Sequence, residues 1–329
     1  MVVMEREKQL DGLKYLLIIL VVIGHFIEPS RNNNHLSSIL YSIIYSFHMP
    51  LFIWISGSLH KQRTIRDEVL KCVPLLETCI ISHIFFLLLR NGIRWSFFDL
   101  INFASDPSWY LLSLVCWRIL SSFLLRYFSK YQLLLLSIVV DLLFIITLKH
   151  GGILSIGRTV FFYPYFVLGH CLAIKDVMQF KYKGLLYMLG LCALVFVCMT
   201  SGIIQHLLLY QRTGIFDIVN RTGHGVLILL LFRYSLIISS LLLSTVVIIT
   251  LYKGKLLLEI AKYGQYTLFI YFIQTMMFAV IGTMDISFLN SLVLSLVSIP
   301  LITYLATLPL ARFILNPVSY CYRSFKGIE

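Results

Sequence analysis

Charged residues are scarce in this sequence. Only 13% of its 329 residues are Asp, Glu, Lys or Arg, and 15 of them are acidic. A soluble domain carries about 25% charged residues, so this composition excludes an ordinary water-soluble protein. Long polar segments are also missing, and no stretch between apolar blocks is long enough to form a soluble domain. We therefore expect a single membrane domain over residues 1–329.

Metal-binding and nucleic-acid-binding signatures are missing as well. The seven cysteines are odd in number and lack close metal-type spacing, so neither a disulfide framework nor a metal site is expected. The net charge of +12 is divided among short clusters between apolar blocks. A membrane protein places Lys and Arg in this way beside anionic headgroups, and we expect no nucleic-acid partner.

Apolar residues fill the rest of the chain: 59% are hydrophobic, and the mean hydropathy is +0.88. Blocks of about 20 apolar residues have the length of membrane-spanning helices. They predict an all-α, polytopic integral membrane protein with about ten transmembrane helices, lying near 13–28, 40–59, 72–90, 109–128, 131–148, 158–175, 184–204, 226–251, 263–282 and 288–309.

The distribution of basic residues predicts the orientation. With the N-terminus inside, eighteen of the 27 Lys and Arg residues lie in the inner segments, and seven lie in the outer ones. This bias follows the positive-inside rule. We therefore expect both termini in the cytoplasm and a multi-pass protein in the lipid bilayer of the cell membrane.

Ionisable residues in an apolar helix are costly and are candidates for function. In the first span, LDGLKYLLIILVVIGHFIEP, Asp11 is predicted to cap the helix. Lys14 lies one turn in, and His25 follows eleven residues later. Eleven residues rise about 16 Å and return to nearly the same face. The structural alternative is that Lys14 snorkels to the interface and His25 bonds a neighbouring carbonyl.

Acidic side chains near these spans need partners too. Glu28 lies three residues beyond His25, where it could orient the imidazole. It could equally be an interfacial charge before Pro29 ends the helix. Glu77 and Arg118 lie within the third and fourth spans and could form a buried pair.

The second span contains FHMPLFIWISG. Pro50 is expected to break or kink this helix, and a histidine beside a broken membrane helix often lines a polar cavity, which makes His48 a candidate. Ser56, Gly57 and Ser58 are small, and we expect them to permit close helix packing.

Aromatic and basic residues begin two further spans at the outer level. Trp109 and Tyr110 are either interfacial belt residues or a stacking platform for a sugar. Arg158 begins the sixth span at the same level. Together with His25 and His48, these three could face one outer pocket.

Five segments together resemble the landmarks of the acyltransferase family 3 membrane proteins, in particular the branch of fucose 4-O-acetylases and polysaccharide O-acetyltransferases. In order they are LDGLKYLLIILVVIGHF, FHMPLFIWISGSL, SWYLLSLVCWRIL, YFVLGHCL and YGQYTLFIYFIQT. Lys14 and His25 match the family's basic residue, ten intervening residues and histidine. Many members carry Arg instead, and Lys lacks its forked contact with phosphate. Gln274 stands where a histidine is expected.

The resemblance implies a bacterial plasma-membrane (inner-membrane) O-acyltransferase. The donor would be acetyl-CoA or another cytosolic acyl-CoA, and the acceptor a sugar hydroxyl of a cell-surface polysaccharide or its lipid-linked precursor. Lys14 would attract the CoA phosphates, and His25 would act as general base or carry the acyl group. Glu28 and His48 are predicted to complete the catalytic set, and no metal is implied.

The outer residues would then bind the acceptor: Trp109, Tyr110 and Arg158. The soluble esterase-like domain that is fused to some relatives has no counterpart in this sequence. Two other functions fit a polytopic membrane protein, a transporter or flippase of glycan intermediates and a structural subunit of a glycan-assembly complex. The spacing of Lys14 and His25 favours the enzyme, because transport needs no base or nucleophile at a fixed distance from a cation.

Overall fold

The computed structural model describes residues 7–103, 106–147, 152–201, 215–284, 286–308 and 310–315. Helices dominate these ranges, and their only β pairing is an isolated bridge between Asn102 and Ile153. The elements are α1 (Lys8–Ile27), η1 (Pro29–Asn32), α2 (His35–Leu59), α3 (Ile65–Asn91), α4 (Phe97–Ile101), α5 (Trp109–Leu124), α6 (Lys130–Thr147), α7 (Ile156–Cys171), α8 (Ile174–Val177), α9 (Lys183–Met199), α11 (Ile215–Thr222), α12 (Val226–Leu251), α13 (Lys255–Ile260), η2 (Ala261–Tyr266), α14 (Thr267–Ile281), α15 (Phe288–Thr307) and α16 (Leu310–Leu315).

The predicted fold class is confirmed. Among the described residues, seven helical segments are long and apolar enough to cross a bilayer, and α5 and α9 are shorter apolar helices. Each of the ten predicted spans coincides with one helix: α1, α2, α3, α5, α6, α7, α9, α12, α14 or α15.

Side-chain caps explain why some helices begin before their apolar blocks. The side chain of Asn34 accepts a hydrogen bond from the Ser37 amide, and α2 therefore begins at residue 35. Thr64 caps α3 in the same way by accepting from the Asp67 amide. These caps satisfy backbone donors that a helix end leaves unpaired.

Helices α1 and α2 form the centre of the bundle. In each, 67% of the most apolar window is buried, compared with 22% for α6 and 28% for α15. The peripheral helices present side chains such as Leu135, Leu143, Leu294 and Val297 on the outside, as lipid-facing helices do. The residues on α1 and α2 are therefore enclosed by the rest of the molecule.

Close packing of α2 against α7 depends on glycine. A Cβ on Gly57 would lie 1.9 Å from the Phe166 carbonyl oxygen, and one on Gly169 would lie 2.4 Å from the Ser58 nitrogen. The predicted packing role of the small residues in α2 is thus confirmed at Gly57. The helix also continues through Pro50, so the expected break is absent.

A buried ion pair joins α6 to α12. Arg233 contacts both carboxylate oxygens of Asp141, at 2.6 and 2.7 Å, and its guanidinium lies 4.5 Å from the ring centre of Phe161 on α7. Both charged residues are buried. Removing either partner alone would leave a buried charge uncompensated.

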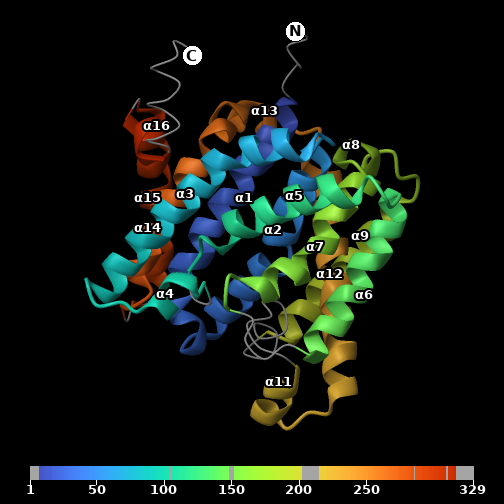
Figure 1. Cartoon of the computed structure of the whole chain (residues 1–329). Coiled ribbons are helices and arrows are strands. Elements are labelled where there is room, and N and C mark those ends of the chain that lie inside the picture. The colour runs from blue at the N-terminus through green and yellow to red at the C-terminus, as the bar shows by residue number, and fades with distance from the viewer. Residues whose placement is uncertain are drawn as a thin grey trace.

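Both ends of the described chain lie at the same end of the bundle (Figure 1). The start of α1 lies there with α8, α13 and α16, and we call this the inner end. The short helices α4 and α11 lie at the opposite, outer end. This arrangement agrees with an even number of membrane crossings. Two of the outer basic residues, Lys149 and Arg212, lie outside the described residues.

Candidate active site

His25 lies near the outer end of α1 and contacts two polar side chains. Its Nδ1 is 3.1 Å from the hydroxyl of Tyr45 on α2 and 3.4 Å from Oε2 of Glu28. The Tyr45 hydroxyl in turn donates to Glu28 Oε2 over 3.2 Å. The side chains of His25 and Glu28 are 17% and 16% exposed, so these three groups form a partly buried triad.

The hydrogen-bond pattern indicates which ring nitrogen of His25 holds the proton. The Tyr45 hydroxyl donates its proton to the Glu28 carboxylate, so its oxygen is an acceptor toward His25. The Nδ1–H group of His25 can then donate to the Tyr45 oxygen and to Glu28. The lone pair then lies on Nε2. A carboxylate that orients an imidazole through one nitrogen and leaves the other basic is the arrangement of a general base.

Aromatic and basic neighbours hold this triad from outside. Arg31 in η1 is 3.6 Å from Oε1 of Glu28, and its guanidinium lies 4.9 Å from the ring centre of Tyr41. The Tyr41 ring stacks on Tyr45 with centroids 3.8 Å apart. Glu28 thus contacts His25 and Tyr45 through one oxygen and Arg31 through the other.

His48 lies one helical turn beyond Tyr45 and is buried. Its Nδ1 is 2.6 Å from the Ile44 carbonyl oxygen, and because a carbonyl only accepts, Nδ1 carries the proton. Its ring meets the Tyr45 ring edge-on at 4.9 Å. The structure therefore brings the predicted catalytic residues His25, Glu28 and His48 together around Tyr45.

Lys14 lies at the other end of α1. Its Nζ is 3.5 Å from Oδ1 of Asp11, and its side chain is 23% exposed. The prediction that Asp11 caps the helix is wrong, because α1 already begins at Lys8 and Glu7 is the capping position. Asp11 instead pairs with Lys14. Since α1 is continuous between them, Lys14 and His25 are about 16 Å apart along its axis.

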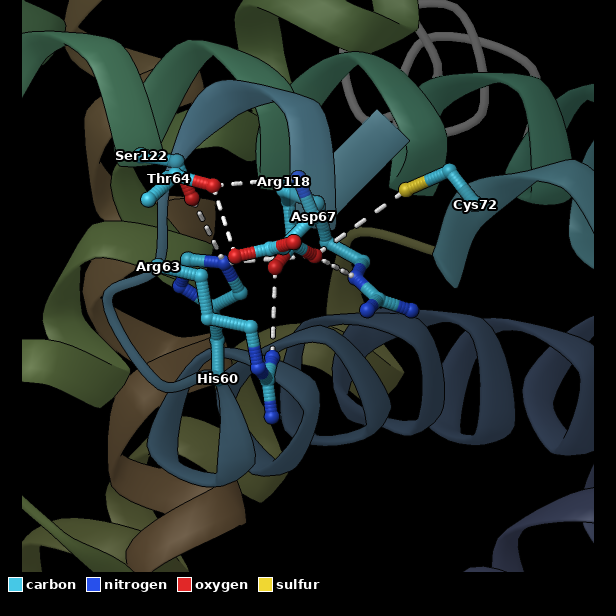
Figure 2. A network of polar contacts seen from close by, with 8 residues as sticks. His60, Arg63, Thr64, Asp67, Cys72, Arg118 and Ser122 are labelled. Atoms are coloured by element: carbon cyan, nitrogen blue, oxygen red, sulfur yellow. Dashed lines mark hydrogen bonds and ion pairs between the residues drawn. The ribbon is translucent and has the colours of Figure 1, made fainter. Parts of the chain in front are cut away.

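Figure 2 shows a second polar network, which we call the inner network. Its residues come from the turn between α2 and α3, the first turn of α3 and the second half of α5. At its centre, the buried carboxylate of Glu68 contacts Arg118 Nε at 2.6 Å, Arg63 NH1 at 3.2 Å and His60 Nε2 at 3.6 Å. The Ser122 hydroxyl lies 3.2 Å from the same His60 nitrogen. These contacts hold the turn between α2 and α3 against α5.

Arg118 pairs with Glu68 rather than with Glu77, so the predicted partner is wrong. Glu77 is nine residues further along α3, about 13 Å deeper in the bundle. Burial lowers the pKa of His60 to about 4, against the opposing effect of Glu68. His60 is therefore neutral at neutral pH, and the two arginines balance the buried carboxylate.

The predicted acceptor residues Trp109, Tyr110 and Arg158 form a second buried group. The Arg158 guanidinium lies 5.1 Å from the ring centre of Trp109, which also stacks on Phe162 at 5.4 Å. The Tyr110 hydroxyl is 3.0 Å from that of Ser56. The Trp109 ring is thus already in contact with Arg158 and Phe162, and its role in sugar stacking stays a prediction.

Comparison with known proteins identifies the family. The profile of the acyltransferase domain of the acyltransferase 3 family matches residues 7–312, which is nearly the whole chain. The chain belongs to the acyltransferase 3 family. It contains an acyltransferase domain over nearly its whole length, and its long apolar helices are those of a multi-pass membrane protein.

A curated relative is the nodulation protein NolL of Sinorhizobium fredii (strain NBRC 101917 / NGR234). It is 28% identical to this chain over 187 residues, a region that covers 51% of this chain and 49% of the relative. The chain therefore spans about half the length of the curated relative it matches. No solved structure gives a significant match.

In this acyltransferase 3 protein, sequence reasoning missed Tyr45. Its hydroxyl contacts both His25 and Glu28. The spacing along α2 indicates only that Tyr45 is one turn from His48, and it gives no sign of a contact with α1. Gly24 permits the contact, because a Cβ there would lie 2.7 Å from the Tyr45 ring. The sequence feature that could have indicated Tyr45 is the glycine directly before His25, which allows an aromatic residue of the next helix to approach.

A buried hydrogen-bonded group beside Trp109 was also missed; it consists of His83, Asp106 and Ser108, and we call it the clamp. Asp106 accepts hydrogen bonds from Nδ1 of His83 on α3 and from both the amide and the hydroxyl of Ser108. The Ser108 hydroxyl therefore points at the carboxylate rather than at the imidazole, which is not the order of a nucleophilic triad. The clamp fixes the start of α5 and with it Trp109.

Gln274, the departure from the family pattern, is buried in α14. Its amide nitrogen donates to the Thr275 hydroxyl over 3.2 Å. The contacts of His25 with Tyr45 and Glu28 do not involve Gln274, so the geometry of the candidate site is formed without it.

Proposed function

We propose that this acyltransferase moves an acyl group, with acetyl as the expected one, from cytosolic acyl-CoA to a sugar hydroxyl. The acceptor is a cell-surface polysaccharide or its lipid-linked precursor, and the protein lies in the plasma (inner) membrane of a bacterium with both termini in the cytoplasm. The observation that carries the proposal is that Lys14 and His25 lie on one continuous helix, α1, with Glu28 and Tyr45 in contact with the His25 imidazole.

The length of α1 suits the donor. Acyl-CoA has its phosphates at one end and its thioester at the end of a long pantetheine arm. Lys14 at the inner end supplies a cation for a phosphate, and the arm would extend about 16 Å along α1 to His25. Lys14 is already 3.5 Å from Asp11, so a phosphate would compete with this carboxylate.

His25 supplies the chemistry in this proposal. Its Nε2 lone pair takes the proton of the sugar hydroxyl while that oxygen attacks the thioester carbonyl carbon. The carbon–sulfur bond then breaks, and the leaving thiolate takes the proton from the imidazolium, which yields the ester and free CoA. The alternative order, in which Nε2 first carries the acyl group, uses the same atoms. Glu28 and Tyr45 hold the ring and stabilise its cationic form in either order.

The test compares the two ends of α1 in the full-length protein, purified in detergent. Release of CoA and formation of O-acetyl groups are measured with acetyl-CoA and with the glycan fraction of the source membrane as acceptor. We expect His25→Ala to lower kcat by about 10²-fold or more, as for loss of a general base. We expect Lys14→Ala to raise the KM for acetyl-CoA with a smaller change in kcat.

The same assay separates the enzyme from a transporter or flippase. If His25→Ala keeps its O-acetylation and instead loses glycan export from cells, the proposal is wrong. An unchanged KM for acetyl-CoA in Lys14→Ala would remove Lys14 from the donor site. Lys8→Ala, an exposed lysine at the same end of α1, is the matched control for Lys14 and should leave that KM unchanged.

A further inference from the structure

A cavity of about 230 Å³ opens at the outer end of the bundle. It lies between the end of α1 with η1, the last turn of α3 and the end of α14. Its polar lining comes from Glu28, Arg31, Asn32, Arg90 and Thr283. The cavity is smaller than the 300–1,000 Å³ typical of drug-sized ligands. It would therefore admit one polar group of a larger ligand.

The charges in this lining favour an anion. The lining contains two guanidiniums, Arg31 and Arg90, and a single carboxylate, Glu28. That carboxylate already contacts Arg31 through Oε1 and His25 through Oε2. Among the described residues, Arg90 has no acidic partner, and its guanidinium lies 5.7 Å from the ring centre of Phe86. A ligand oxyanion would complete the coordination of Arg90.

The cavity is next to the candidate base. Glu28 both lines the cavity and contacts His25, and the ring of Phe278, another lining residue, lies 4.6 Å from the His25 ring. The donor's phosphates, however, are expected at Lys14, about 16 Å away at the inner end. An anion at the outer end therefore belongs to a molecule other than the donor.

We infer that this cavity binds a phosphate or carboxylate group of the acceptor, close to the hydroxyl that receives the acyl group. The inference rests on the proposed function and narrows it to anionic acceptors. Arg90 would contact the oxyanion, and Asn32 and Thr283 would offer hydrogen bonds to neighbouring ring hydroxyls. Such a contact would orient the acceptor before its hydroxyl reaches His25.

The test measures binding of glucose 1-phosphate, with glucose as the uncharged comparison, to the full-length protein in phosphatidylcholine nanodiscs. Isothermal titration calorimetry needs no acyl transfer, so it reports on the cavity alone. We expect Arg90→Gln to weaken glucose 1-phosphate binding about tenfold or more, as for loss of a charge-assisted hydrogen bond. Arg90→Lys should retain much of the affinity. Arg94→Gln, a matched loss of charge at an exposed residue outside the cavity, should change nothing.

Equal binding of glucose and glucose 1-phosphate, or equal weakening by Arg90→Gln and Arg94→Gln, would overturn the inference. Nanodiscs containing phosphatidylglycerol test the other source of a phosphate. If that lipid abolishes glucose 1-phosphate binding to the parent, the cavity is a lipid headgroup site and the acceptor assignment fails. Acetyl-CoA hydrolysis without acceptor is measured in parallel. Its loss in His25→Ala supports the proposed function independently, whatever Arg90→Gln does.

Discussion

At the residue scale, the hydroxyl of Tyr45 joins His25, in the last turn of α1, to Glu28, the residue that caps this helix. His25 and Glu28 are three residues apart, and their side chains alone approach to 3.4 Å. Tyr45 adds contacts of 3.1 Å to the imidazole and 3.2 Å to the carboxylate. It therefore fixes both the rotation of the ring and the nitrogen that carries the proton, although it touches neither donor nor acceptor in the proposed reaction.

Replacing Tyr45 by Phe tests this positioning role. The ring and its stacking on Tyr41 remain, but the hydroxyl is lost. We expect kcat to fall about tenfold, while the KM for acetyl-CoA and the thermal unfolding midpoint change little, since one hydrogen bond contributes about 0.5–1.5 kcal/mol.

Tyr163→Phe is the matched control. Its hydroxyl lies 3.1 Å from that of Ser121, far along the chain from α1, so the variant loses one similar hydrogen bond outside the site. If both variants lower kcat equally, the effect is general destabilisation and Tyr45 has no positioning role.

The spacing of residues along one helix predicted some of the contacts at the candidate site and missed others. The contact of His25 with Glu28 follows from positions three apart on one helix, and the structure contains it. The partner of Arg118 could not be found in this way, because Glu68 lies in the first turn of another helix. Hydropathy places that turn outside the span, while the fold buries the Glu68 side chain within it. Cross-helix pairs depend on the relative depth of two helices, which residue spacing does not report.

At the element scale, the approach of α2 to α7 is set by two glycines. We predict that Gly57→Ala destabilises the protein, because the added Cβ would lie 1.9 Å from a backbone oxygen of Phe166 that cannot rotate away. Overpacking of this kind costs about 1–3 kcal/mol. The measurement is the thermal unfolding midpoint of the purified protein in detergent.

Gly184→Ala is the control on another helix. A Cβ at Gly184, in the first turn of α9, has nothing within 4 Å. Alanine there should be neutral or slightly stabilising, since it favours the helix over glycine by up to about 1 kcal/mol. An equal melting midpoint for both variants would show that α2 and α7 do not pack as closely as described.

Helix existence was predictable from the sequence, and helix boundaries were less so. Within the described residues, apolar blocks identified each long helix, because lipid requires continuous apolar segments. The first helical turns of α1 and α3 are polar, and a hydropathy window excludes them. Their ends depend on local hydrogen bonds, such as the Thr64 cap of α3. Likewise, α2 keeps its helical path through Pro50 because the surrounding helices enclose it.

At the scale of the whole molecule, the two ends of the bundle have different chemistry. Lys14 and the inner network with its buried Glu68 lie at the inner end. The His25 triad and the cavity with Arg90 lie at the outer end. In the proposed reaction the donor and the acceptor therefore enter from opposite sides of the membrane, and only the acyl group needs to pass between them. The proposed reaction therefore requires the protein to be inserted with Lys14 on the cytoplasmic side of the membrane.

The last prediction concerns this orientation. Lys61, in the turn between α2 and α3, and Arg94, in the loop after α3, are both exposed and belong to opposite ends of the bundle. In intact cells we expect a membrane-impermeant maleimide to label Arg94→Cys above the background of the parent chain. Lys61→Cys should be labelled only after the membrane is permeabilised. Both sites are polar and exposed, so a difference between them reports sidedness rather than burial. Labelling of Lys61→Cys in intact cells, without labelling of Arg94→Cys, would place Lys14 outside, where cytosolic acyl-CoA cannot reach it, and would contradict both the orientation and the donor assignment.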